Sequence, residues 1–139
     1  MPRVLFLCTG NSARSILAEY LLRSLDPRFE TYSAGSHPKG EVHPLAIQVL
    51  REVYGIDAGD ARSKSWEVLR EIDFDHVITV CDNARQSCPI WPGKAVMSHW
   101  DLEDPAAVEG TEAEKLRAFE ETARLLHDRL ATFRETRTA

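Results

Sequence analysis

The sequence opens with an unbroken apolar run that ends in a cysteine. Val4–Leu7 contains no polar residue, so it predicts a strand buried on both faces, as in a parallel sheet covered by helices. The run stops at Cys8, and a loop of small and polar residues leads to Arg14, where a helical pattern begins. The segment therefore predicts a thiol in the loop between a buried strand and the N-terminus of a helix.

The loop after Cys8 has the features of an oxyanion site. Gly10 permits a positive φ angle and a close approach of the backbone to a ligand, so successive N–H groups can turn inward. The helix adds its free N–H groups and the positive end of its dipole. Arg14 can grip two oxygens of a tetrahedral oxyanion. Ser15 can donate a hydrogen bond to a Cys8 thiolate, which the same positive field favours.

We therefore expect Cys8 to be a nucleophile, with Arg14 and Ser15 assisting it. The alternative is that Cys8 is only a small buried side chain of the core. The expected substrate-binding residues are Thr9, Gly10, Asn11, Ser12, Ala13 and Arg14.

Residues 8–15, Cys-Thr-Gly-Asn-Ser-Ala-Arg-Ser, are followed by Leu-Ala-Glu at positions 17–19. This segment resembles the phosphate loop of the low-molecular-weight protein tyrosine phosphatases and of the arsenate reductases that share their fold. The resemblance implies an α/β fold of the phosphotyrosine phosphatase I-like class, with a four-stranded parallel sheet flanked by helices. The loop itself does not choose between the two activities.

Strands and helices alternate along the rest of the chain, which independently favours a parallel sheet. Helical spacing covers about residues 12–25, 43–55 and 111–134, with Ser12 as the N-cap of the first helix and Ser65 as the cap of a short helix through residue 69. Strands are expected at 29–34, 76–81 and 94–98. There is no repeat and no interdomain linker, so we expect residues 1–139 to form a single catalytic domain.

Composition excludes several classes of partner. A net charge of −5 and a pI of about 5.5 argue against nucleic acid or an anionic membrane surface. No apolar run approaches the ~20 residues of a membrane span, and the start of the chain lacks a signal-peptide pattern. We therefore expect a cytoplasmic protein with no nucleic-acid or membrane partner.

The cysteine and histidine content argues against a metal site. Three cysteines are an odd number, which fits poorly with a permanent disulfide framework. The histidines near the later cysteines make no familiar zinc spacing, so we expect no metal and no cofactor. None of the five histidines, His37 included, sits beside a nucleophile in a recognisable motif, and we assign them no role.

Two further cysteines separate the possible activities. Cys81 ends the expected strand 76–81 and should emerge at the same sheet edge as Cys8. Cys88 follows seven residues later, about 10 Å away if the segment were helical. A disulfide needs Cα atoms roughly 4.4–6.8 Å apart, so the segment cannot stay helical when the two pair. A phosphatase has no use for these thiols, whereas a dithiol supplies the two electrons that reduce pentavalent arsenic. The alternative is that both are buried and inert.

The spacing of Cys81 and Cys88 is similar to that of the thioredoxin-coupled arsenate reductases. The resemblance implies arsenate as substrate and thioredoxin as electron donor, with glutaredoxin or another thiol left open. In the family the catalytic acid is the aspartate directly before a proline, which falls here on Asp104. Ala106 stands where the phosphatases commonly carry tyrosine, a point against phosphotyrosine as substrate.

We predict an arsenate reductase with a thiol–disulfide relay through Cys8, Cys81 and Cys88, and with a weak phosphatase side activity. One alternative is a low-molecular-weight protein tyrosine phosphatase that uses Cys8, Arg14 and Asp104 alone. Another is an oxyanion-binding protein without catalysis.

Some arsenate reductases of this type bind potassium near the loop through an asparagine, a glutamate, a serine and an aspartate. Asn11, Glu19 and Ser33 match the first three positions, but the fourth falls on Lys64. We expect the Lys64 ammonium to take the place of the cation and to neutralise Glu19, which predicts no dependence on potassium.

Overall fold

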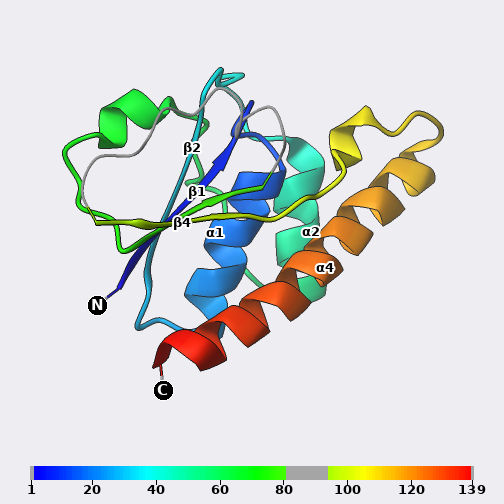
Figure 1. The fold of residues 1–139 in the computed structure, drawn as a ribbon. Helices are drawn as coiled ribbons and strands as arrows, with labels where there is room; N and C mark the ends of the chain where they lie inside the picture. The colour runs from blue at the N-terminus through cyan, green and yellow to red at the C-terminus, as the bar shows by residue number, and fades with distance from the viewer. Residues whose placement is uncertain (1, 81–93, 139) are drawn as a thin grey trace.

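The computed structural model describes residues 2–80 and 94–138 and has an α/β fold (Figure 1). The strands are β1 (Arg3–Cys8), β2 (Glu30–Gly35), β3 (His76–Thr79) and β4 (Val96–His99). The helices are α1 (Arg14–Leu25), α2 (Pro44–Tyr54) and α4 (Glu112–Thr138), with 3₁₀ turns η1 (Trp66–Leu69) and η2 (Pro105–Ala107). The strands pair in parallel in the order β2-β1-β3-β4, which confirms the expected four-stranded parallel sheet flanked by helices.

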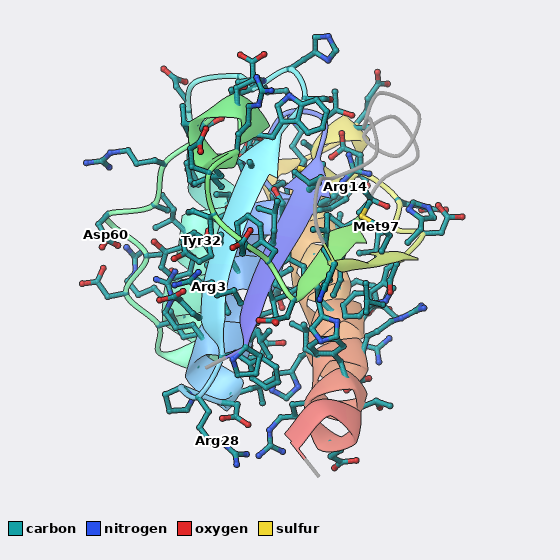
Figure 2. The ribbon with its side chains drawn as sticks, turned by 60° about the vertical axis from the view of Figure 1, so that its left-hand side comes forward. Arg3, Arg14, Arg28, Tyr32, Asp60 and Met97 are labelled. Carbon is teal, nitrogen blue, oxygen red and sulfur yellow. The ribbon has the colours of Figure 1, made fainter. Side chains whose placement is uncertain are left out.

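The three long helices lie together on one face of the sheet (Figures 1 and 2). Ser33 of β2 faces this layer and donates a hydrogen bond to Glu19 of α1. The neighbouring residue Tyr32 projects from the opposite face, as Figure 2 shows, and its ring meets Phe74 edge-on at 5.2 Å. Successive side chains of a strand point to opposite faces, so β2 contacts the helices on one face of the sheet and Phe74 on the other.

Strand β1 is the centre of the core. Val4–Leu7 are at most 2% exposed, as the unbroken apolar run predicts. β1 lies between β2 and β3, and all strands point the same way, so the loops that follow β1 and β2 lie next to each other at the carboxyl edge of the sheet.

Helix α1 begins later than the sequence predicts. Its first residue is Arg14 and its N-cap is Ala13, with no side-chain cap hydrogen bond within the described part of the chain, so the assignment of Ser12 as N-cap was wrong. Ser12 belongs to the preceding loop, where its carbonyl oxygen accepts a hydrogen bond from the His43 N–H at 2.9 Å. Ser65 does cap the turn at 66–69, as predicted, by accepting from the Glu67 N–H at 3.2 Å.

Helix α2 is capped by a histidine that also touches the loop before α1. The His43 Nδ1 accepts a hydrogen bond from the Leu45 N–H at 3.1 Å, and its ring lies 4.6 Å from that of Phe119. Together with the bond from its own N–H to Ser12, these contacts hold α2 against that loop and against α4. In the described part of the chain, no helix is both long and apolar enough to cross a membrane.

We predict that stability falls on mild acidification because of His43. Burial, aided by the charge of Lys39, lowers the pKa of His43 from its ordinary 6.5. The unfolded chain therefore binds a proton that the folded chain resists, and stability is lost as the pH falls through about 6.5. Protonation of Nδ1 also removes the acceptor of the cap. The melting temperature, followed by circular dichroism, should drop between pH 7.5 and 5.5.

The matched variant is His43→Asn, which keeps an N-cap acceptor but does not titrate. Its melting temperature should be lower at both pH values, because the contact with Phe119 is lost. Its drop between the two pH values should be smaller than that of the parent protein, and an equal drop would contradict the assignment.

Candidate active site

Cys8 ends β1 with its thiol surrounded by hydrogen-bonding groups. It is 2% exposed, its Sγ lies 2.9 Å from the Ser15 Oγ, and the Asn11 N–H donates to the same sulfur at 3.3 Å. Groups that donate to sulfur stabilise its negative form. The structure therefore brings Cys8, Asn11 and Ser15 together as the sequence predicts.

The side chain of Asn11 sets the direction of the Ser15 hydroxyl. The Asn11 Nδ2 donates to the Ser15 Oγ at 2.8 Å, and the Asn11 Oδ1 accepts from the Lys64 N–H at 2.9 Å. Because Ser15 Oγ already accepts one hydrogen bond, its own proton is available to point at Cys8.

We call residues 8–14 the anion loop. The residue with a positive φ angle in this loop is not the one that the sequence predicts. The positive φ angle belongs to Asn11, at 46°, a residue type that tolerates the left-handed region. Gly10 has no positive φ, so the expected role for its conformational freedom was wrong. Instead, the lack of a side chain at Gly10 lets the Lys39 side chain approach the loop closely, because a Cβ at Gly10 would lie 3.2 Å from Lys39 side-chain carbons.

The end of β2 also presses against the anion loop. A Cβ at Gly35 would lie only 2.6 Å from the Thr9 carbonyl oxygen, so only glycine fits there. The Gly35 N–H donates to the Lys64 carbonyl at 2.9 Å. β2 and the segment before η1 therefore support the loop from behind.

Arg14 begins α1 and reaches the loop that follows β4. Its Nη1 donates to the Leu102 carbonyl at 2.9 Å, and its Nη2 lies 3.7 Å from the Asp104 Oδ2. The other carboxylate oxygen of Asp104 caps η2 by accepting from the Ala106 N–H at 3.0 Å. Figure 2 shows Arg14 near the carboxyl ends of the strands, far from Arg28 at the other end. The expected acid and the expected anion-binding arginine thus face each other.

A cavity of about 180 Å³ lies over the anion loop. This space is large enough for one small tetrahedral oxyanion. Asn11 and Ser15, both 0% exposed, support the loop from below. The described residues that line the cavity are Cys8, Thr9, Gly10, Ser12, Ala13, Arg14, His37, Lys39 and Asp104. The expected site residues Cys81 and Cys88 lie outside the described residues.

His37 and Lys39 are the lining residues that the sequence analysis did not assign to the site. Both follow β2, and His37, to which the sequence assigned no role, lies in the cavity wall. The strand order was the available signal: the strand before this loop is a neighbour of β1, so the loop emerges at the same edge as Cys8.

A buried carboxylate lies beneath the anion loop. Glu19 is 7% exposed, accepts from the Ser33 Oγ at 2.5 Å and pairs with Arg23 at 2.7 Å. Burial raises the pKa of Glu19, and the Ser33 hydrogen bond with the charges of Lys64 and Arg23 opposes this shift. The Lys64 Nζ itself donates to the Arg62 carbonyl at 3.0 Å. Lys64 therefore acts on Glu19 through its charge, as expected, while Arg23 makes the direct ion pair.

These features place the chain in a defined family. The family model for low molecular weight phosphotyrosine protein phosphatase matches residues 3–137. The match spans nearly the whole chain, and the chain belongs to this family.

The relatives within the family include both reductases and phosphatases. The arsenate reductase of Oceanobacillus iheyensis is 38% identical over 136 residues, which cover 96% of this chain and 95% of the relative. A solved arsenate reductase in the phosphate-binding state has a TM-score of 0.80 at 30% identity, with 96% of each chain covered. The low molecular weight protein tyrosine phosphatase from T. tengcongensis also has a TM-score of 0.80, at 28% identity, with 98% of this chain and 99% of the other covered. The thioredoxin-dependent arsenate reductase of Corynebacterium glutamicum has a TM-score of 0.66 at 32% identity, covering 95% of this chain and 63% of the other. Backbone similarity alone therefore does not separate the two activities.

We predict that Ser15→Ala makes the Cys8 thiol harder to ionise, because it removes the hydroxyl 2.9 Å from the sulfur. A hydrogen bond to a charged group contributes about 1.5–3 kcal/mol, so the pH midpoint of Cys8 alkylation by iodoacetamide should rise by about one pH unit or more. Mass spectrometry of the peptide that contains Cys8 measures its alkylation separately from that of the other cysteines. Ser24→Ala, at an exposed position of the same helix, is the control and should leave the midpoint in place. An unchanged midpoint in Ser15→Ala would refute the role of this hydroxyl.

Proposed function

We propose that this chain is an arsenate reductase whose site consists of the anion loop, the acid Asp104 and a relay of Cys8, Cys81 and Cys88. The observation that carries the proposal is the cavity over Cys8, where a thiol, the Arg14 guanidinium and the Asp104 carboxyl converge on space for one oxyanion. The similarity to the arsenate reductase of O. iheyensis along 96% of the chain supports reduction as the reaction. So does the presence of two further cysteines at the spacing of a relay.

The first step forms a sulfur–arsenic bond. Backbone N–H groups of the anion loop and the Arg14 fork hold the arsenate oxygens. The Cys8 thiolate attacks arsenic, and one oxygen leaves with a proton supplied by Asp104. Arsenic stays pentavalent in this step. Asp104 lies on the side of Arg14 and is partly open to solvent, with 38% of its side chain exposed, so it can regain a proton.

The second step moves the electrons. The Cys81 thiolate attacks the Cys8 sulfur and forms a disulfide. The sulfur–arsenic bond breaks, its electron pair stays on arsenic, and trivalent arsenite leaves. Cys88 then attacks the Cys81 sulfur, which releases the Cys8 thiolate and leaves a Cys81–Cys88 disulfide. Two thiols are oxidised for each arsenate reduced.

The remaining disulfide needs a dithiol donor, and we propose thioredoxin. The similarity to the thioredoxin-dependent enzyme of C. glutamicum supports this choice, and glutaredoxin or another thiol is the alternative. The relay works only where thiols are kept reduced, so we also propose a cytoplasmic location. We propose in addition that residues 1–139 form a single catalytic domain.

The second candidate is a phosphatase, because phosphate and arsenate have the same shape and the tyrosine phosphatase from T. tengcongensis shares the fold equally well. That reaction needs only Cys8, Arg14 and Asp104. Ala106, in place of the tyrosine common in phosphatases, favours the reductase, and a weak activity on aryl phosphates is consistent with both.

We predict that Cys88→Ser completes about one turnover and then stops. Without Cys88 the Cys8–Cys81 disulfide is not resolved, so arsenite should form in about one equivalent per enzyme. NADPH-coupled reduction with thioredoxin and thioredoxin reductase measures turnover, and mass spectrometry under non-reducing conditions identifies the disulfide. Sustained turnover of this variant with thioredoxin would contradict the relay.

Cys81→Ser is the matched control, because it removes a relay thiol and leaves Cys8, Arg14 and Asp104 unchanged. It should lose arsenate reduction and keep any hydrolysis of an aryl phosphate. If the parent protein hydrolyses the aryl phosphate but reduces no arsenate with thioredoxin or glutaredoxin, the phosphatase is the correct function. If it binds arsenate but performs neither reaction, it is a binding protein.

We further predict that the rate of arsenate reduction does not depend on potassium. Glu19 already has a hydrogen bond from Ser33 and an ion pair with Arg23, and Lys64 adds a second positive charge nearby. Initial rates in KCl and in NaCl at equal ionic strength should therefore agree within about twofold, since a cation finds no unneutralised carboxylate here. A several-fold higher rate in KCl than in NaCl would show that a cation binds despite Lys64.

A further inference from the structure

The segment after β2 runs alongside the anion loop. We call residues 36–43 the wall loop, since this segment supplies one side of the cavity. Four of its backbone N–H groups donate to four carbonyl groups of the anion loop. These bonds are Ser36 to Cys8 at 3.3 Å, His37 to Thr9 at 2.9 Å, Lys39 to Gly10 at 3.0 Å and His43 to Ser12 at 2.9 Å. The register between the two loops is therefore fixed along their length.

This register places Lys39 beside Gly10. A Cβ at Gly10 would lie 3.2 Å from both Cγ and Cε of Lys39 and 3.4 Å from its Cδ. The aliphatic stem of Lys39 thus lies across the glycine, and Lys39 is one of the residues that line the cavity. A glycine at position 10 leaves the space that this path needs.

A serine from a distant segment holds the same part of the wall loop. The Ser63 Oγ donates to the Gly10 carbonyl at 3.0 Å and accepts from the Gly40 N–H at 3.1 Å. Gly40, directly after Lys39, has a φ of 86°, which a glycine adopts without strain. The backbone is therefore held at Lys39 by the Gly10 carbonyl and at Gly40 by the Ser63 hydroxyl, although the Lys39 side chain is exposed.

We propose that Lys39 is a substrate-binding residue of this site: its ammonium is a second cation at the rim of the cavity that captures the oxyanion before Cys8 attacks it. The inference deepens the proposed function, on which the identity of the oxyanion as arsenate rests. The capture of a tetrahedral oxyanion as such rests on the cavity alone.

The charge balance of the protein explains the need for such a residue. The chain has a net charge of −5, which opposes the approach of an anion, and the Asp104 carboxylate lies in the cavity wall beside Arg14. The ion pair that Asp104 makes within the described part of the chain is with Arg14, at 3.7 Å, and Lys39 makes none with it. The positive charge of Lys39 acts on neighbouring groups, since it helps to lower the pKa of His43.

Because the ammonium is exposed, its contribution to binding should be modest and sensitive to salt. It should also be the same before and during the reaction, since Lys39 lies at the rim rather than beside the sulfur. Loss of a contact of this kind raises KM and leaves kcat unchanged.

The test compares Lys39→Met, which keeps an apolar stem over Gly10 and removes the charge, with Lys39→Arg, which restores a charge. Arg51→Met is the matched control, because it removes one positive charge at an exposed position of α2. Two readouts are needed: the Kd of inorganic phosphate from its protection of Cys8 against iodoacetamide, and KM and kcat for arsenate with thioredoxin.

We expect Lys39→Met to raise the phosphate Kd and the arsenate KM by the same factor, about three- to tenfold at low ionic strength. The factor should shrink at 0.5 M NaCl (roughly a 4 Å screening length). Lys39→Arg should recover most of the loss, and Arg51→Met should stay within about twofold of the parent on both readouts.

Three results would overturn the proposal: an unchanged phosphate Kd in Lys39→Met, an equal rise in Arg51→Met, or a fall in kcat with KM unchanged. The phosphate measurement also separates this inference from the proposed function. If phosphate binding depends on Lys39 but arsenate is not reduced, the function is wrong and the binding role stands. If arsenate is reduced but the phosphate Kd is unchanged in Lys39→Met, the proposed function stands and the binding role of Lys39 is wrong.

Discussion

The buried amide of Asn11 holds the candidate site in one arrangement. It is 0% exposed, and its two ends bind the Ser15 hydroxyl in α1 and the Lys64 backbone before η1. A buried amide without partners would cost about 1–3 kcal/mol per group, so these contacts favour the arrangement in which the anion loop, α1 and the segment before η1 meet. Asn11 makes these contacts from a left-handed backbone, with a φ of 46°, and its Nδ2 donates to the Ser15 Oγ, which leaves the Ser15 proton for Cys8.

The sheet could be predicted from sequence because its signal is local. Val4–Leu7 is buried because it is uniformly apolar, and the alternation of strands with helices implies parallel pairing. The conformation of the anion loop could not be predicted in the same way. Its turn at residue 11 and the late start of α1 depend on partners such as Lys64 and His43, which lie some 30 to 50 residues away in the chain.

The residues of the candidate site also fall into two groups, those with a local signal in the sequence and those that depend on distant parts of the chain. Cys8, Arg14 and Ser15 belong to one contiguous segment with a recognisable pattern, whereas His37 and Lys39 join the cavity only through the pairing of β2 with β1. Glu19 shows a related limit: the sequence predicted that its charge is compensated, and Arg23 lies four residues further along the same helix, but only the packing of α1 on β2 identifies Ser33 as a partner. The relay assigned to Cys81 and Cys88 remains a prediction from sequence.

The contact between the two loops has a consequence for how such proteins diversify. The nucleophile and the arginine lie on one segment, and the rim of the cavity lies on another, which is joined to the first mainly through backbone groups. Backbone hydrogen bonds tolerate most changes of side chain, so the rim can accumulate substitutions while the reacting groups keep their positions. The side chains after β2 can therefore change the chemistry of the rim while the backbone contacts that position this segment stay in place.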